Sequence, residues 1–363
     1  MKRNGFLDYA KGVLIVLVMI GHAVQFTMYQ DKDFWDDPLL KAIYLFHMPL
    51  FMGLSGYLSW SGLQKGHFGP YALNKLKAYI LPVFSWAVLY CLIAFAIQGG
   101  GVTAATALPG AIVDKATTTL WFLWALCSCL LITAAIKTVG RAFWTLVALA
   151  FAGMLLLPEG PNFTTLKFMF PYFMVGYALA ESKITPLRRE TSIVLFTLAC
   201  LVTILCYNLW QKDSYIYTTG MILKRWNINN CALRYTAGFF GSISAFFTLR
   251  FIYKLSPDSF RRPVEILGQD SIYVYILQGN LFAALLHLAR QLSLPVITGL
   301  TSSLLSIAEG IAMAALCWFV GRVLNKSALL GLLLFGRSKK RPTPPAPVLQ
   351  IQPTRAQPAE IET

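Results

Sequence analysis

The sequence predicts an all-α, polytopic integral membrane protein. Of its 363 residues, 56% are hydrophobic and only 13% are charged, and the mean hydropathy is +0.59. Soluble domains carry about twice that share of charged residues. A helix that crosses a bilayer needs about 20 mostly apolar residues in a row, and the chain contains many runs of roughly that length. These runs are therefore expected to be membrane-spanning helices.

The apolar runs define about ten expected transmembrane helices. They lie at 12–28, 39–60, 78–98, 119–136, 142–157, 163–180, 191–209, 230–253, 271–289 and 299–321. The fifth run is the shortest. The first run lacks the small-residue cleavage site of a signal peptide, so it is expected to remain as the first helix.

The positions of the charged residues predict the orientation. Most of the 31 Lys and Arg lie before the first expected helix, after the tenth, or in the loops on that same side. Because cytoplasmic loops carry an excess of Lys and Arg, both termini are predicted to be cytoplasmic. The first loop on the other side, 31–37, is acidic. The net charge of +15 therefore reflects topology, and the lack of a basic soluble domain argues against nucleic-acid binding.

Composition divides the chain into two regions. Residues 1–325 are predicted to form one membrane-embedded domain, and residues 326–363 a basic, Pro-rich cytoplasmic tail. The composition of the tail is typical of disordered segments, and its basic start at 337–341 is expected to contact anionic lipid. The seven cysteines lack metal-site spacing and are interpreted as packing residues, so no metal is expected.

The first expected helix carries three ionisable residues, Asp8, Lys11 and His22. Such residues are costly inside a membrane and usually serve a function there. At about 100° and 1.5 Å per residue, the step from Lys11 to His22 returns to within about 20° of one helical face and spans about 16 Å. Asp8 lies about 40° from His22 on the same side. A carboxylate and an ammonium near the membrane surface are therefore expected in line with an imidazole about halfway across.

The second expected helix contains another imidazole, His47, followed by Pro49 and Ser55. A proline inside a membrane helix frees a backbone carbonyl, and Gly53 and Gly56 permit a second helix to approach closely. By itself His47 is typical of a hydrogen-bonded structural histidine. Beside the ionisable residues of the first helix, it becomes a second candidate for catalysis.

Together these segments resemble the membrane-bound acyltransferase 3 family, which modifies carbohydrates with acetyl or related groups. The resemblance covers residues from about 5 to 325. Its motifs lie at 7–12, 21–22, 46–57, 74–77, 120–123, 170–177 and 267–273. The Asp-x-x-Lys-Gly form at 8–12 and the His-Met-Pro-Leu-Phe string at 47–51 are most similar to the branch of fucose 4-O-acetylases and exopolysaccharide acetyltransferases. Two positions differ: Lys11 stands where the family often has arginine, and Gln278 where it often has histidine, so no role of that histidine is carried over.

The resemblance implies an O-acetyltransferase. Its donor would be acyl-CoA, most simply acetyl-CoA, and its acceptor a hydroxyl of a cell-surface polysaccharide, a lipid-linked precursor or a related glycan. A neutral imidazole suits removal of the hydroxyl proton, and His22 is the candidate base. Asp8, which could hold either Lys11 or a neighbouring lysine, and His47 complete the catalytic candidates.

The protein is expected to have binding residues for both the donor and the acceptor. The phosphates of CoA need cations on the cytoplasmic side, where Lys11, Lys75 and Lys77 lie in the predicted topology. For Lys75 and Lys77, a role as positive-inside topology anchors fits the sequence as well as a role in donor binding. The candidates for acceptor binding are Trp121, Glu309 and Ser55. Glu309 also fits an interhelical contact, and Trp121 an interfacial aromatic belt.

Two other functional classes stay open at this point. Ten helices with intramembrane charges also fit a secondary transporter, although no inverted repeat is visible. A non-catalytic subunit of a polysaccharide export machine is the third class, and the intact charged and imidazole residues argue against it. The expected location is a bacterial inner membrane. The expected partners are the glycan acceptor, lipids, and either polysaccharide biosynthesis machinery or a second copy of the chain.

Overall fold

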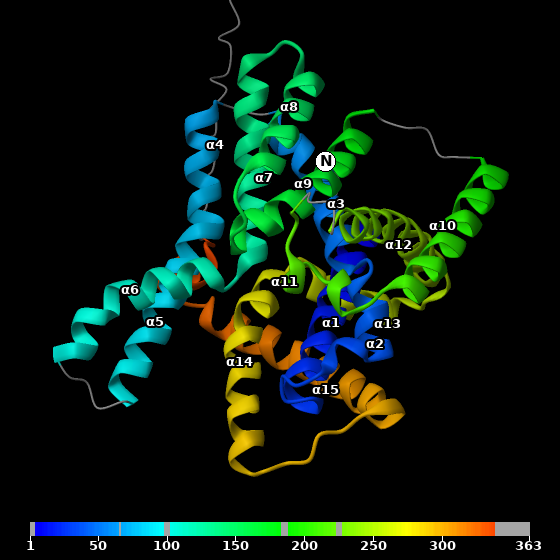
Figure 1. Cartoon of the computed structure of the whole chain (residues 1–363). Coiled ribbons are helices and arrows are strands. Elements are labelled where there is room, and N and C mark those ends of the chain that lie inside the picture. The colour runs from blue at the N-terminus through cyan, green and yellow to red at the C-terminus, as the bar shows by residue number, and fades with distance from the viewer. Residues whose placement is uncertain (1–3, 65–66, 98–101, 183–187, 223–226, 338–363) are drawn as a thin grey trace, which may run out of the picture.

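The computed structural model describes residues 4–64, 67–97, 102–182, 188–222 and 227–337, and within these residues all regular structure is helical (Figure 1). The α-helices are α1 (Gly5–His22), α2 (Pro38–Tyr44), α3 (His47–Leu63), α4 (Phe68–Lys75), α5 (Leu81–Ile97), α6 (Val102–Thr118), α7 (Trp121–Val139), α8 (Phe143–Leu156), α9 (Pro161–Glu181), α10 (Arg189–Leu209), α11 (Ile216–Thr219), α12 (Ile228–Leu255), α13 (Asp258–Gln269), α14 (Ser271–Gln291), α15 (Gly299–Leu324) and α16 (Ala328–Phe335). Two π-helical segments, η1 (Ala23–Met28) and η3 (Leu76–Ile80), and two short 3₁₀ turns, η2 (Phe34–Asp36) and η4 (Lys212–Ser214), complete the described chain.

The all-α, polytopic fold class is confirmed. Seven helical segments of the described chain are long and apolar enough to cross a membrane: α1 with η1, α2 with α3, α4 with η3 and α5, α7, α10, α14 and α15. The other three expected spans coincide with α8, which is apolar but has only 14 residues, and with the longer but more polar α9 and α12. The number of ten crossings and the side of each terminus stay predictions.

Proline breaks the second expected span into two helices. The ring of Pro49 clashes with the carbonyl four residues earlier and lacks an N–H, and the chain leaves helical geometry at Phe46, where φ is −139°. Helix α2 therefore ends at Tyr44 and α3 begins at His47. The imidazole of His47 lies at this break, and its Nδ1 is 2.8 Å from the carbonyl oxygen of Ile43 in α2.

Two further spans contain π-helical turns, which are rare and often lie at functional sites. Helix α1 continues without interruption into η1 immediately after His22. Helix α4 passes through η3 into α5. Pro82 follows η3 and has no N–H for the carbonyl of Ala78, which accounts for the altered hydrogen bonding at this point. Hydropathy gives no sign of either π-helical segment.

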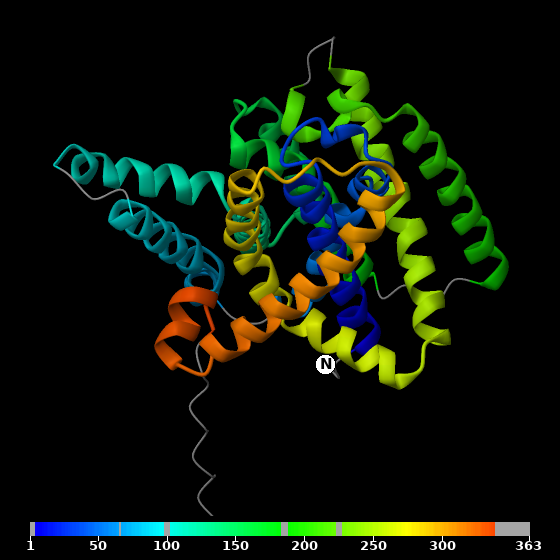
Figure 2. The same cartoon turned by 90° about the horizontal axis from the view of Figure 1, so that it is seen from below.

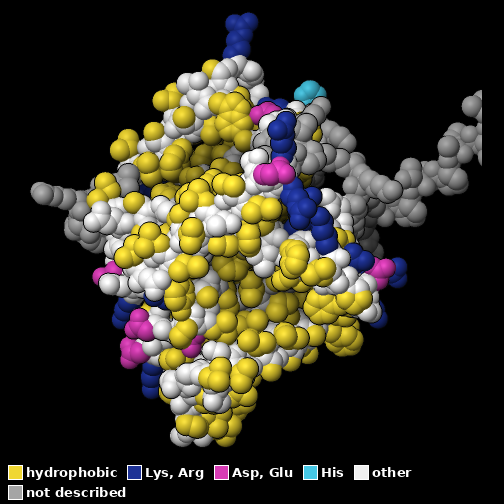
Figure 3. All heavy atoms as spheres, turned by 90° about the vertical axis from the view of Figure 1, so that its right-hand side faces the viewer, with side chains coloured by type: hydrophobic (Ala, Val, Ile, Leu, Met, Phe, Trp, Pro, Cys, Tyr) yellow, Lys and Arg dark blue, Asp and Glu magenta, His cyan; other side chains and the backbone are white. Residues whose placement is uncertain are grey.

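Helix α1 lies in the middle of the bundle, where it contacts α3, α13, α14 and α15 (Figures 1 and 2). Helices α5 and α6 project from the bundle as a pair in both views. Helix α6 was not among the expected spans. On the face that carries α10, hydrophobic side chains form a broad area and charged side chains gather toward its edges (Figure 3), as expected for a surface in contact with lipid.

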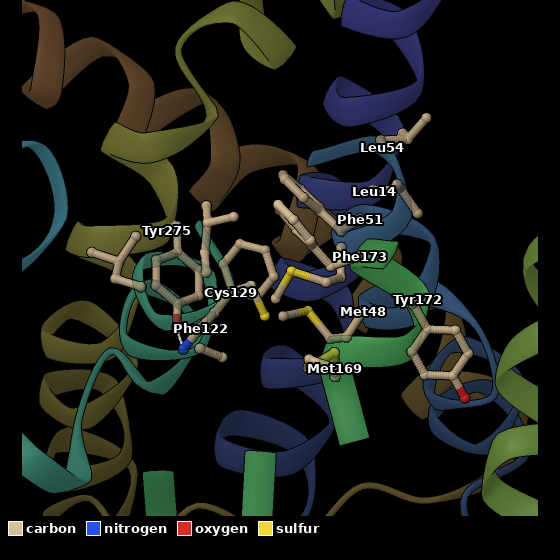
Figure 4. Close-up of a cluster of buried hydrophobic side chains, with 14 of the residues drawn as sticks. Leu14, Met48, Phe51, Leu54, Phe122, Cys129, Met169, Tyr172, Phe173 and Tyr275 are labelled. Atoms are coloured by element: carbon tan, nitrogen blue, oxygen red, sulfur yellow. Dashed lines mark hydrogen bonds between the residues drawn. The ribbon is translucent and has the colours of Figure 1, made fainter. Parts of the chain in front are cut away.

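The core joins α1, α3, α7, α9 and α14 (Figure 4). Within it the hydroxyl of Tyr275 accepts the N–H of Phe122 at 2.9 Å. Helices α3 and α9 pack backbone to backbone: a Cβ at Gly176 would lie 1.8 Å from the carbonyl oxygen of Gly53, and one at Gly56 would lie 2.0 Å from that of Phe173. The close approach predicted from Gly53 and Gly56 is confirmed.

Hydrogen bonds between helix ends and connecting segments that are distant in sequence identify the two ends of the bundle. At one end, called the far end below, they join the segments that follow α1, α8, α10 and α14. These bonds run from Ile297 N–H to Met28 O (3.0 Å), from Tyr215 O–H to Trp35 O (2.9 Å) and from Met221 N–H to Glu159 Oε2 (3.1 Å). At the N-terminal end, the bonds run from Lys137 Nζ to Leu63 O (3.0 Å), from Trp144 Nε1 to Glu181 Oε2 (3.1 Å) and from Arg337 Nη2 to Gln269 O (3.0 Å).

The packed part of the chain extends beyond the expected domain boundary at residue 325. Helix α16 packs against α5, and the indole N–H of Trp86 donates to the carbonyl of Leu334 at 3.0 Å. Helix α16 has eight residues and is apolar, so removing its side chains from water lowers the free energy of the folded chain. Residues 326–337 therefore belong to the membrane domain rather than to the predicted tail. Residues 338–363 lie outside the described part of the chain.

The predicted orientation can be tested by cysteine labelling. Asp33 and His67 are both exposed but lie at opposite ends of the bundle. If the N-terminal end is cytoplasmic, an impermeant thiol reagent added to intact cells labels Asp33→Cys and leaves His67→Cys unlabelled until the cells are opened. The unsubstituted chain is the control, since six of its cysteines are buried and Cys200 is partly buried. Labelling of His67→Cys in intact cells would reverse the orientation.

Candidate active site

A pocket of about 490 Å³ extends from the N-terminal end into the bundle. Its volume lies in the range of small-molecule sites, about 300–1,000 Å³. Gly62, Lys75 and Arg337 line its outer part, while Met48 and Val18 line it further along α3 and α1. Most of the wall is apolar, and none of the described lining residues is Asp or Glu. The cations that line it are Lys11, Lys75 and Arg337.

Asp8 and Lys11 form an ion pair at the start of α1. Their Oδ1 and Nζ atoms are 2.9 Å apart, one helical turn from each other, so of the two partners that the sequence left open for Asp8 the structure shows Lys11. Helix α13 presses on the same turn, because a Cβ at Gly268 would lie 1.8 Å from the carbonyl oxygen of Asp8. Asp8 is buried, whereas Lys11 reaches the pocket.

The structure separates Lys75 from Lys77. Lys75 lines the pocket, and its ammonium lies 5.2 Å from the ring centre of Tyr71 and 5.8 Å from that of Tyr79. Such contacts stabilise a cation without neutralising it, and no described carboxylate forms an ion pair with Lys75. Lys77 is exposed and lies outside the pocket wall. The two lysines are therefore not equivalent candidates for binding an anion.

His22 ends α1 and its ring packs against two aromatic rings that also contact each other. The ring centres of Phe26 and Phe282 are 5.5 Å and 5.9 Å away. The Nδ1 atom of His22 is buried and has no hydrogen-bond partner among the described residues. His22 is not among the residues that line the large pocket. A molecule in this pocket therefore does not contact His22 directly in this structure.

His47 is held in a different way. A carbonyl oxygen only accepts, so the bond between Nδ1 and Ile43 O places a proton on Nδ1 and leaves the Nε2 of a neutral ring with its lone pair. His47 lines a small second cavity with Tyr44 and Tyr217, and the next residue, Met48, lines both cavities. Helix α1 contacts both α2 and α3, so the first two spans do come together.

The three acceptor candidates are dispersed. Ser55 lines the large pocket and donates to the carbonyl of Phe51 at 2.8 Å. Trp121 lies outside that wall and contacts Tyr217, with ring centres 6.2 Å apart. Glu309 accepts a hydrogen bond from the hydroxyl of Thr27 at 2.7 Å, which is the interhelical contact that the sequence left open.

An arginine that the sequence did not assign to the site fixes the far end. Arg234 is fully buried, and its guanidinium donates to the carbonyls of Ser214 and Asp213, both at 2.7 Å, and to that of Gly220. It thereby anchors the loop that carries Tyr215 and Tyr217 against α12. Only the tertiary fold reveals this role, because most of the acceptors of Arg234 are backbone carbonyls.

Glu159 reinforces the same end. Its carboxylate lies 2.6 Å from the ammonium of Lys167. Burial raises the pKa of the Glu159 carboxyl, but hydrogen bonds from Lys167, Thr164 and the backbone of Met221 outweigh it and hold the pKa below its ordinary value. The carboxylate therefore stays ionised and bridges the segments that follow α8 and α11.

No metal site is evident within the described residues. They include no group of three or more His, Cys, Asp or Glu side chains that could hold an ion. The expectation that the protein needs no metal stays a prediction.

The described residues form a polytopic helical bundle with a cation-lined pocket, and comparison with known proteins gives its class. Residues 4–322 match the acyltransferase 3 family model, described as an acyltransferase domain. The chain therefore belongs to the acyltransferase 3 family and is an acyltransferase. This decides against the transporter and the non-catalytic subunit.

The chain is similar to two curated proteins. It is 28% identical over 301 residues to nodulation protein NolL of Mesorhizobium japonicum, covering 77% of each chain. It is 29% identical over 295 residues to nodulation protein NolL of Sinorhizobium fredii, covering 77% of this chain and 78% of that one. No solved structure matches the chain significantly.

Proposed function

We propose that the protein is an O-acetyltransferase of a bacterial inner membrane, which transfers an acetyl group from acetyl-CoA to a hydroxyl of a cell-surface glycan or its lipid-linked precursor. Membership of the acyltransferase family supports the reaction class. The observation that carries the rest is the large pocket, because it is lined by cations at the N-terminal end and, further inside, by Met48, the residue next to His47.

The pocket suits a thioester donor with phosphates at one end. Its cations lie in the outer part, and Met48, next to His47, lies further inside. A pantetheine arm is long and largely uncharged, so it fits an apolar channel, while the phosphates stay with Lys11 and Lys75. Lys75 is the stronger of the two candidates, because Lys11 is neutralised by Asp8.

The proposed chemistry needs one base. The acceptor hydroxyl oxygen attacks the thioester carbonyl carbon while an imidazole takes the hydroxyl proton, and the carbon–sulfur bond then breaks as the CoA sulfur leaves. The imidazolium returns the proton to the sulfur. His22 is the proposed base. His47, whose Nε2 is free to accept a hydrogen bond, is placed to orient the hydroxyl.

Aromatic side chains on the other side of His47 are proposed to bind the glycan. Tyr44 contacts His47 with ring centres 4.9 Å apart and Tyr217 at 6.4 Å, and Tyr217 contacts Trp121. Tyrosine and tryptophan offer an apolar face with a polar edge, which matches the surface of a sugar ring. Membrane lipids, biosynthetic enzymes of the glycan or a second copy of this chain are the proposed neighbours.

His22→Ala is expected to lower acetyl transfer by about 10² to 10⁴, the usual effect of losing a general base. The measurement is glycan O-acetyl content by NMR at matched levels of membrane-inserted protein. His287→Ala is the control, since His287 is exposed on α14 and should keep wild-type activity. Retention of more than about a tenth of the activity in His22→Ala would remove His22 from the role of base.

Lys75→Ala is expected to raise the KM for acetyl-CoA by about tenfold or more with a smaller effect on kcat, because it removes a charge-assisted contact to phosphate. Steady-state kinetics with acetyl-CoA as the varied substrate measure this. Lys77→Ala is the matched control two residues away and should leave the KM unchanged. Equal effects of the two substitutions would mean that both lysines act only as topology anchors.

A further inference from the structure

The segment after α16 forms part of the pocket wall. Phe335, Gly336 and Arg337 all line the pocket. Gly336 has φ +63°, and a Cβ there would lie 2.3 Å from the carbonyl oxygen of Ala78 in η3, so a larger residue would be both strained and in collision. The chain thus turns tightly against η3, which places Arg337 on the same wall as Lys75.

Asp270 holds Arg337 in one orientation. This buried carboxylate lies between α13 and α14, and its Oδ1 is 2.9 Å from Nη1 of Arg337. The same guanidinium donates to the hydroxyl of Tyr273 at 2.7 Å and to the carbonyl of Gln269 at 3.0 Å, and it lies 4.4 Å from the ring centre of Tyr273. An arginine fixed at three points loses little freedom when it binds a ligand.

Arg337 keeps donors for a ligand. A guanidinium has five N–H groups, and the three hydrogen bonds to Asp270, Tyr273 and Gln269 leave the Nε–H and one Nη2–H without a described partner. The side chain is 37% exposed. The planar arginine fork matches the oxygens of a phosphate group.

Positive charge exceeds negative charge at this wall. Asp270 is a single carboxylate, yet it pairs with two guanidiniums, because Arg322 Nε lies 2.9 Å from its Oδ2. This cluster therefore carries one net positive charge, and Lys75 adds a second. Lys11 adds none, since Asp8 balances it.

We infer that Arg337 is a phosphate-binding residue of this pocket, that Asp270 is its positioning residue, and that the ligand is the pyrophosphate or phosphate ester end of the acyl-CoA donor. The inference rests on the proposed function for the identity of the donor. It assigns a binding role to Arg337, which lies at the basic start of the tail predicted from the sequence.

Arg322 provides a matched control. It pairs with the same carboxylate as Arg337 and lies 4.7 Å from the ring centre of Trp318, but it does not line the pocket. Substituting either arginine removes one ion pair of Asp270. Only the substitution of Arg337 removes a donor that faces the pocket.

The test uses the full chain in phosphatidylcholine nanodiscs with CoA as the ligand, and calorimetry measures the Kd. Arg337→Gln is expected to raise the Kd by about 10- to 100-fold, the effect of a lost charge-assisted hydrogen bond, and Arg322→Gln by less than about threefold. Arg337→Lys, which keeps the charge but not the fork, should lie between wild type and Arg337→Gln. In kinetics, Arg337→Gln should raise the KM for acetyl-CoA and leave that for acetyl-pantetheine, which lacks phosphate, unchanged.

The outcomes separate the two proposals. If the wild type binds CoA and Arg337→Gln binds it with the same affinity, the role of Arg337 is overturned and the proposed function stands. Absence of CoA binding and of acetyl transfer in the wild type would overturn both. In nanodiscs that also contain phosphatidylglycerol, loss of binding of this lipid in Arg337→Gln, with CoA affinity unchanged, would assign Arg337 to a lipid headgroup instead. If Arg337→Gln fails to fold, Arg337→Lys with a KM equal to wild type for both donors decides against the fork geometry.

Discussion

The site is organised by the need to satisfy backbone polar groups where no water is available. Inside a bilayer each unpaired carbonyl or N–H is costly, so an interrupted helix must find other partners. Pro49 interrupts the second span, and the imidazole of His47 bonds to the carbonyl of Ile43 at that break. The same bond fixes the tautomer of His47. A single hydrogen bond therefore both satisfies a carbonyl of the broken helix and sets the tautomer of a candidate site residue.

Close packing at α1 has a comparable effect on the charged residues. Gly12 and Gly268 let α13 approach α1 so closely that an added Cβ would collide with backbone atoms. Asp8 is buried in this contact and pairs with Lys11. Because Asp8 neutralises Lys11, the excess positive charge of the pocket lies at Lys75 and Arg337. Lys75 has no ionic partner among the described residues, and Asp270 pairs with two arginines.

Hydropathy and helical spacing predict what depends on local sequence. The apolar runs locate the spans, and the spacing of Asp8 and Lys11 anticipates their ion pair, because residues three apart share a helix face. The π-helical turns, the difference between Lys75 and Lys77, and the packing of α16 depend on contacts between distant segments. Arg337 illustrates the limit: its sequence neighbours are basic and Pro-rich, whereas its partners Asp270 and Tyr273 lie more than sixty residues earlier.

The two histidines differ in a way that bears on their proposed roles. The proton on Nδ1 of His47 is held by a carbonyl, so this ring can accept a hydrogen bond at Nε2 but is tied in place. His22 has an unpartnered Nδ1 and aromatic neighbours, so no described group restrains its tautomer. It is followed directly by η1, in which Thr27, five residues later, lies on the same side of a π-helix and donates to Glu309. This contact anchors the backbone next to His22 to α15, while the Nδ1 of the imidazole keeps no described hydrogen-bond partner. A fixed ring with an unpartnered nitrogen suits the proposed role of a group that takes up and releases a proton.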